Sequence, residues 1–210
     1  MKKKITNLKI SEVKKLNSLK DIYPIINLVK TENRYSILSK LSKTLIIEYF
    51  QIAIRSKNLF LFILKFKNKI IGYSLYTKNE DSLIKDFKKI KFKIFIELII
   101  GLKFFSLINI FFAITKLDLI FLKKKNLFKE KTINLNLLAI NKNFQSKGFG
   151  KYFLTKTIKK IHKNSYKYRY ITCEAPNVRA VDFYIKKKHF KFVGKKIRFP
   201  RSLYVLIKKI

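Results

Sequence analysis

Cysteine and histidine are scarce in this chain, and each scarcity excludes a class of site. The single cysteine, Cys173, excludes an internal disulfide and a cysteine-cluster metal site. The two histidines, His162 and His189, have no partner at metal-ligand spacing, which argues against a zinc site. We therefore expect no bound metal.

Acidic residues are also few: 12 Asp and Glu accompany 49 Lys and Arg, so the formal net charge is +37. Such a charge attracts nucleic acid or an anionic membrane surface. A/T-rich coding alone would also produce this excess of Lys, Ile, Asn and Phe. Arginine, which makes the bidentate base contacts of many nucleic-acid readers, occurs at only six positions. Nucleic acid is therefore the less favoured partner.

The chain has no apolar run long enough for a membrane-spanning helix. Its basic start, residues 1–4, is not followed by a continuous apolar stretch, so it is not typical of a signal peptide. In the most apolar region the longest uncharged run is 104–115, with 12 residues. A spanning helix needs about 20. Together with the single cysteine, these features lead us to expect a cytoplasmic protein.

The first part of the chain combines helical and extended patterns. Alternating apolar residues predict a strand over 5–13, and helical spacing predicts helices over 19–29 and 43–56. Two β-rich runs, 59–64 and 70–76, flank a short polar link and predict a hairpin.

Residues 79–129 depart from this plan. A polar cap at 79–82 precedes apolar residues at near-heptad spacing, Gly101 divides the pattern, and 102–122 is apolar almost all round. We expect an inserted apolar helical hairpin. It is either buried against the core or a partner, such as a second copy in a homodimer, or it lies in a membrane interface with its lysines among the headgroups. The second alternative predicts a peripheral protein on the inner face of the membrane.

The second half returns to alternating strands and helices. The pattern predicts strands over 133–140, 168–173, 190–198 and 203–207, and helices over 148–162 and 177–188. Without internal repeats or a disordered linker, residues 1–210 are expected to form one α+β domain with a mixed sheet.

A glycine-containing turn connects the strand 133–140 to the next helix. Its sequence is Gln145-Ser146-Lys147-Gly148-Phe149-Gly150. Glycine permits close backbone approach and the first amides of a helix lack internal acceptors, so such a turn can hold a diphosphate. The spacer of a P-loop is absent, and Phe153 occupies the place of the third glycine of a dinucleotide fingerprint. Taken alone, the turn is as consistent with a connection that binds nothing.

Two segments together resemble the GNAT N-acetyltransferase family. Residues 138–150 resemble the family's acetyl-CoA motif, Leu-Ala-Val, a short loop and Gln/Arg-x-x-Gly-x-Gly/Ala. Asn177, Ala180, Phe183 and Tyr184, followed by Lys186 and Phe190, resemble its Asn-x-x-Ala-x-x-Phe-Tyr-x-Lys signature. The resemblance covers most of the chain outside 79–129. It implies an α/β/α three-layer fold, a mostly antiparallel sheet with helices on both faces, and acetyl transfer from acetyl-CoA to a primary amine.

The resemblance also implies the cofactor-binding positions. Backbone amides of 145–151 would hold the diphosphate, and the strand before them would pair with the pantetheine arm, beside a bulge that opens a gap to the next strand. The positions are Leu138, Ala139, Ile140, Gln145, Ser146, Lys147, Gly148, Phe149, Gly150, Lys151 and Asn177. Asn177 is in any case expected to cap its helix.

Direct transfer needs a base for the ammonium group and an acid for the departing thiolate. Tyr184 matches the family's acid; otherwise it would be a core aromatic. Where family members often carry a glutamate base, this chain has Asn134. Glu174, at the end of the next strand, is the nearest remaining carboxylate, and deprotonation through water is the alternative. His189 stands where the family has a helix-ending glycine, so we expect an altered turn there.

The motifs do not specify the acceptor. Residues 19–56 and the hairpin would overlie the acceptor side, and the hairpin's character favours an amphiphilic or membrane-linked amine over a soluble amine or a protein N-terminus. A longer acyl donor is also compatible with the motifs. The rival class of function is a non-catalytic basic protein with this fold that binds a membrane surface or nucleic acid.

Overall fold

The computed structural model describes residues 7–14, 19–78, 86–115, 132–164 and 168–210. The strands in these residues are β1 (Leu8–Glu12), β2 (Leu59–Phe66), β3 (Lys69–Thr77), β4 (Thr132–Ile140), β5 (Tyr170–Ala175), β6 (Lys191–Arg198) and β7 (Arg201–Lys209). They form one sheet in the order β1-β2-β3-β4-β5-β7-β6. Only β4 and β5 pair in parallel, so the predicted mixed, mostly antiparallel sheet is confirmed.

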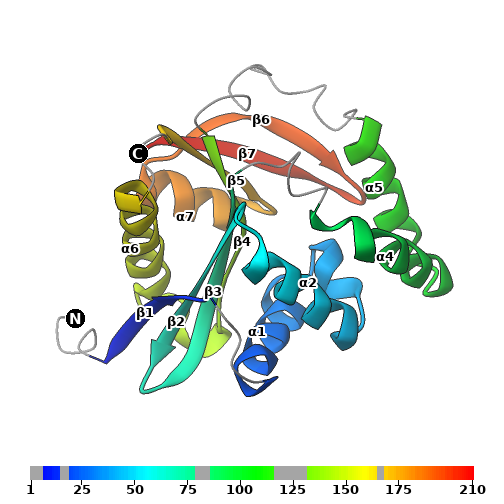
Figure 1. Cartoon of the computed structure of the whole chain (residues 1–210). Coiled ribbons are helices and arrows are strands. Elements are labelled where there is room, and N and C mark those ends of the chain that lie inside the picture. The colour runs from blue at the N-terminus through cyan, green and yellow to red at the C-terminus, as the bar shows by residue number, and fades with distance from the viewer. Residues whose placement is uncertain (1–6, 15–18, 79–85, 116–131, 165–167) are drawn as a thin grey trace.

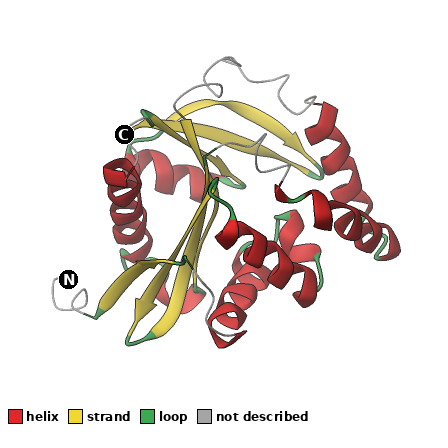
Figure 2. Ribbon diagram, in the orientation of Figure 1, coloured by secondary structure: helices red, strands yellow, loops and turns green. Residues whose placement is uncertain are grey.

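Helices cover both faces of the sheet. The α-helices are α1 (Leu19–Glu32), α2 (Lys43–Arg55), α4 (Lys88–Ile100), α5 (Phe104–Thr115), α6 (Phe149–Asn164) and α7 (Val178–Lys188), and the short 3-10 helices are η2 (Ile37–Lys40) and η5 (Lys142–Phe144). Helices α6 and α7 lie on one face, and α1 and α2 on the other, with α4 and α5 beyond α2 (Figure 1; Figure 2).

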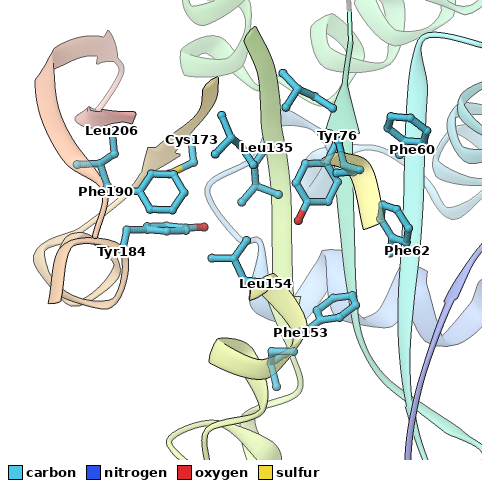
Figure 3. Packing of buried hydrophobic residues seen from close by; sticks show 14 of the residues in the cluster. Phe60, Phe62, Tyr76, Leu135, Phe153, Leu154, Cys173, Tyr184, Phe190 and Leu206 are labelled. Atoms are coloured by element: carbon cyan, nitrogen blue, oxygen red, sulfur yellow. The ribbon is translucent and has the colours of Figure 1, made fainter. Parts of the chain in front are cut away.

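Each face of the sheet has its own hydrophobic core. Phe62, Leu135 and Phe153 belong to the cluster beneath α6 and α7, part of which appears in Figure 3. Ile46 and Tyr73 belong to the second cluster, beneath α1 and α2. Because both clusters pack on the same sheet, the elements that carry the site are held from two sides.

The β2–β3 hairpin forms as predicted. Its two turn residues, Lys67 and Asn68, have positive φ values of 47° and 63°. Two such residues in a two-residue loop give a turn whose twist matches that of the flanking strands.

Helix α1 continues to Glu32, past the predicted end at residue 29. The Thr31 hydroxyl donates to the Asn27 carbonyl at 3.0 Å, and the Glu32 carboxylate accepts from residues of a distant loop. Polar residues thus extend this helix because tertiary contacts use them, which periodicity alone does not reveal.

Between β3 and β4 the chain forms α4 and α5. Gly101 caps the end of α4, and α5 coincides with the uncharged run of 12 residues. The helices contact each other, and α4 also contacts α2. No helix in the described ranges is long and apolar enough to cross a membrane. The predicted cap at 79–82, the apolar residues 116–122 and the first residues of the predicted strand 5–13 lie outside the described residues.

The turn after α7 corrects one expectation. His189 adopts the left-handed conformation itself, with φ 57° and ψ 37°, and its N–H bonds to the carbonyl of Ile185. Left-handed backbone costs a non-glycine residue on the order of 1–3 kcal/mol but remains accessible. The helix therefore ends with the geometry that a glycine would supply, and the turn is not altered.

Candidate functional site

A gap opens between the two parallel strands. Residues 132–135 of β4 pair with 170–173 of β5, and the pairing ends at Leu135 and Cys173. On the other side of β4, Leu75 of β3 lies opposite Leu137 and Tyr76 lies opposite Leu135, so Asn136 is a bulge residue. A bulge bends the strand that carries it. The β5-facing edge of β4 beyond Leu135 is left open to an extended ligand.

The glycine-containing turn lies at the end of this open edge. Gly148 has φ 82° and Ser146 has φ 61°, and helix α6 begins at Phe149. The amides of the first helical turn have no acceptor within the helix. Together with the positive end of the helix dipole they make a site for an anion such as a diphosphate.

Gly150 lies where α6 meets α7 and β4. A Cβ at this position would lie 3.6 Å from the Phe183 ring and 3.7 Å from the Ile140 side chain, which is ordinary contact. A side chain added at Gly150 would therefore point into the protein and not toward a ligand at the turn.

Glu32 fixes the start of the loop that leads into the turn. Its carboxylate accepts from the Lys142 backbone N–H at 3.1 Å and from the Gln145 side-chain amide at 2.9 Å. The same Gln145 amide donates to the Ile140 carbonyl at 2.8 Å. Sequence reasoning missed Glu32, because its carboxylate lies more than 100 positions from the loop in the chain; only the charge of a helix-ending glutamate could have hinted at it.

Basic groups surround the turn. The Lys147 ammonium donates to the Asn143 carbonyl at 2.7 Å, and the Arg179 guanidinium lies 3.4 Å from the Ser146 hydroxyl, which links α7 to the turn. Lys188, at the end of α7, is buried and donates to the hydroxyl of Thr155 on α6. Burial, and then the charges of Lys151 and Lys208, lower the pKa of Lys188 to about 8. These groups favour an anionic ligand by their charge.

Tyr184 lies beneath Leu135 and Cys173, the last paired residues before the gap (Figure 3). Its ring is 7% exposed and packs against Phe183 and Phe190 with ring centroids 5.2 Å away. Figure 3 shows the ring reaching from α7 toward Leu135 of β4. Burial raises the pKa of Tyr184 well above its usual value, so the phenol keeps its proton. Within the described part of the chain its hydroxyl has no hydrogen-bond partner.

The two positions considered for a base lie on β4 and β5. The Asn134 amide oxygen accepts from the Thr172 hydroxyl across the paired part of the strands. The Glu174 carboxylate accepts from Lys196 at 2.8 Å. Burial raises the pKa of Glu174, but the charges of Lys196 and Arg198 outweigh it, so the pKa lies below its usual value. Glu174 is therefore ionised, and a weaker base than a free glutamate.

The structure brings most of the sequence-predicted residues together around the gap. Residues 138–140 lie on its open edge, 145–151 at its end, and Tyr184 beneath it. Asn177 instead caps α7, as expected, with its side chain accepting from the Ala180 N–H at 2.9 Å.

Other kinds of site are not supported by the described residues. They contain no group of three or more His, Cys, Asp or Glu placed to hold a metal ion. A cavity of about 460 Å³ lies along β6, lined among others by Phe192, Gly194 and Ser202. None of the residues predicted to bind acetyl-CoA lines this cavity. Lys196, which pairs with Glu174, belongs to its wall.

Comparison with known proteins agrees with this geometry. A model of the Acetyltransferase (GNAT) family matches residues 22–190. A search of curated protein sequences finds no match to the chain.

Solved structures share the fold at low identity. A GNAT-family protein from Desulfovibrio desulfuricans has a TM-score of 0.59 at 11% identity, over 96% of this chain and 98% of that one. A GNAT family acetyltransferase from Elizabethkingia anophelis, solved with acetyl-CoA bound, gives 0.52 at 15%, over 98% and 99%. The ribosomal-protein-S18-alanine N-acetyltransferase from Escherichia coli gives 0.56 at 10%, over 97% and 94%.

Proposed function

Since this chain belongs to the GNAT acetyltransferase family, we propose that it transfers an acetyl group from acetyl-CoA directly to a primary amine. The observation that carries the proposal is the gap beyond Leu135 and Cys173, with the glycine-containing turn and the first residues of α6 at its end and the Tyr184 phenol beneath it. The diphosphate would bind the amides of 145–151. The pantetheine arm would pair with the open edge of β4 at Leu138 and Ile140.

The transfer step exchanges one bond for another. The neutral amine nitrogen attacks the thioester carbonyl, so that a C–N bond forms and the C–S bond breaks. The amine loses a proton to a base, and the departing thiolate takes one from an acid. Tyr184 is the proposed acid. Its protonated hydroxyl would donate to the sulfur, and solvent would later restore its proton.

Glu174 is the proposed proton acceptor, directly or through a water molecule. Its ion pair with Lys196 keeps the carboxylate ionised, which a proton acceptor requires. The same ion pair makes it a weak base, which favours a water-relayed transfer. The polar position on the neighbouring strand, Asn134, carries no carboxylate and already accepts from Thr172.

For the acceptor we propose an amphiphilic or membrane-linked amine. Support comes from the apolar helices α4 and α5 and from the lysines of α4. Both helices lie on the same side of the sheet as α1 and α2 (Figure 1). Mass spectrometry of aqueous and lipid extracts, after incubation of the protein with acetyl-CoA and cell extract, would identify the acetylated product. A product found only among soluble amines would contradict this part of the proposal.

Replacing Gly148 tests the donor site. Gly148→Val should weaken acetyl-CoA binding about a hundredfold, because a β-branched residue at positive φ costs on the order of 1–3 kcal/mol and its side chain projects from the turn. Calorimetric titration measures the affinity, and thiol release with a panel of amines measures turnover.

Gly150→Ala is the matched control. Its added methyl group meets Phe183 and Ile140 at ordinary contact distance, so binding should stay near that of the unmodified protein. Absence of acetyl-CoA binding by the unmodified protein would contradict the proposal. Binding without thiol release from any amine would favour the non-catalytic alternative.

A further inference from the structure

Helix α4 is apolar on two opposite sides. Ile90 and Leu98 are buried at 4% and 0% exposure, and Leu98 belongs to the core beneath α1 and α2. Phe92, Ile96 and Ile100 follow one another at four-residue spacing, so they form a separate stripe, and they are 69%, 38% and 76% exposed. The core accounts for only the first of these two sides.

Helix α5 buries polar residues beside apolar ones and leaves phenylalanines exposed. Leu107 and Ile110 pack against the core beneath α1 and α2, and Asn109 is buried, whereas Phe104 and Phe105 are 67% and 53% exposed. The Asn109 side-chain amide donates to the Phe199 carbonyl at 2.8 Å, and its side-chain oxygen accepts from the Phe199 N–H at 2.7 Å. This side of α5 thus docks on the turn between β6 and β7, and Phe104 and Phe105 stay outside.

The exposed residues of both helices are continuous through the turn that joins them. Leu102, in this turn, is 89% exposed. We define the apolar hairpin face as Phe92, Ile96, Ile100, Leu102, Phe104 and Phe105. Large exposed apolar patches of this kind mark interaction sites in proteins. Helices α4 and α5, which carry this face, lie at the periphery of the molecule, away from α6 and α7 (Figure 1).

Lysines border the apolar hairpin face. Lys88 and Lys91 are exposed on α4 itself, and Lys93, which is also exposed, pairs with Glu48 at 2.9 Å. Lys40 and Lys43 are exposed on the neighbouring segment, which is tied to the hairpin because the Lys103 ammonium donates to the Lys40 carbonyl. Apolar residues bordered by lysines are typical of helices that lie in a membrane interface, with the lysines among anionic headgroups.

We propose that the apolar hairpin face docks on the surface of an anionic lipid bilayer. Phe92, Ile100 and Leu102 would enter the headgroup region, and the surrounding lysines would contact the anionic lipids. A second copy of the chain suits the face less well, because pairing two copies would bring their lysine borders together in a protein of net charge +37. The contact is independent of acetyl transfer, so it can be tested without acetyl-CoA.

Vesicle flotation with the full chain tests this surface. The protein should float with vesicles of phosphatidylcholine and phosphatidylserine at low salt, much less with phosphatidylcholine alone, and less at high salt, because screening weakens lysine–headgroup attraction. The combined variant Phe92→Ser, Ile100→Ser and Leu102→Ser should lower the vesicle partition coefficient about a hundredfold. Circular dichroism should show an unchanged fold, since all three side chains are exposed.

A matched control removes exposed apolar side chains elsewhere. Tyr35, Val178 and Phe192 are 56%, 64% and 52% exposed on other elements. Changing all three to Ser should leave the partition coefficient within about twofold.

Three results would overturn the proposal: no flotation of the unmodified protein, equal flotation with both vesicle types, or flotation that the hairpin variant does not reduce. Light scattering after size-exclusion chromatography measures the oligomeric state, and so tests whether a second copy of the chain binds the apolar hairpin face instead. A dimer that the hairpin variant dissociates, but the control variant does not, would assign the face to a second copy instead. Acetyl-CoA titration of the same variants is a separate readout of the donor site.

Discussion

The Tyr184 hydroxyl differs from those of two other core tyrosines. The Tyr73 hydroxyl donates to the Asn33 side-chain oxygen at 2.6 Å, and the Tyr76 hydroxyl shares a hydrogen bond of 2.6 Å with Thr157. Among the described residues the Tyr184 hydroxyl has no such partner. In the proposed reaction the sulfur of the departing thiolate would accept its proton.

Replacing Tyr184 by Phe should therefore affect the reaction more than binding. We expect Tyr184→Phe to lower kcat about a hundredfold, the scale of general acid catalysis, with acetyl-CoA affinity within about twofold of the unmodified protein. Steady-state thiol release and calorimetry separate the two quantities.

Tyr76→Phe is the control, because it loses the Thr157 bond while Tyr184 stays in place. It should lower the free energy of unfolding by about 1 kcal/mol and leave kcat nearly unchanged. An unchanged kcat for Tyr184→Phe would show that Tyr184 is only a core aromatic.

Helix α1 holds the loop 141–145 that leads into the glycine-containing turn. Glu32 at its end binds both Lys142 and Gln145, and the Gln145 amide in turn binds the Ile140 carbonyl of β4. We expect Glu32→Ala to weaken acetyl-CoA binding about tenfold, because the loop must then be ordered at the expense of binding free energy. Calorimetry measures the loss.

Thr31→Ala serves as the control for Glu32, since its 3.0 Å hydrogen bond lies inside α1 and its contact with the Glu32 carboxylate is longer, at 3.5 Å. It should leave the affinity unaltered. Glu32→Gln keeps one carboxyl-like oxygen and should recover part of the affinity. If Glu32→Ala lowered only the melting temperature and left acetyl-CoA affinity intact, the role in positioning the loop would be refuted.

Helix α5 is docked on the turn between β6 and β7 through Asn109. Asn109→Ala removes two hydrogen bonds to Phe199 and leaves its backbone groups unpaired, so we expect a loss of about 2 kcal/mol in the free energy of unfolding. Urea denaturation measures it, and Ser106→Ala, another buried polar change on α5, should cost less. A loss below about 0.5 kcal/mol would mean that Asn109 does not hold the helix.

For the whole molecule, the shared sheet predicts that residues 1–210 unfold as one unit. Every strand is paired with its neighbours, and β3 and β4 contribute side chains to both cores. We expect a single calorimetric transition whose van't Hoff and calorimetric enthalpies agree. Two separable transitions would show that the chain is not one domain.

Sequence patterns predicted most of this architecture, and what they missed was set by tertiary contacts. The hairpin at 67–68 and the Asn177 cap follow local rules, so they were predictable. The last turn of α1 was not, because Glu32 is ordered by a distant loop. The polar contact of α5 was not either, since nothing in 104–115 reveals that Asn109 binds the turn at Phe199.

The motif of the proposed acetyl-CoA site was predictable from the sequence, but the side-chain contacts around it were not. A two-glycine turn before a helix indicates anion binding, whereas the ion pair of Glu174 with Lys196 joins residues from two strands that periodicity cannot register against each other. His189 shows the same limit at a single residue. The usual helix ending favours glycine at this position, but the structure accommodates histidine in the left-handed conformation.

The bulge at Asn136 shifts the phase of β4. Before it, the odd-numbered Ile133 and Leu135 belong to the core beneath α6 and α7; after it, the even-numbered Leu138 and Ile140 do. Ala139, which an unbroken alternation would put with them, belongs to the opposite core. The number of residues in this strand therefore determines which face of the sheet each later side chain occupies. Deleting one residue would exchange the two faces of its last four positions, so this half of β4 tolerates substitution far more readily than any change in its residue count.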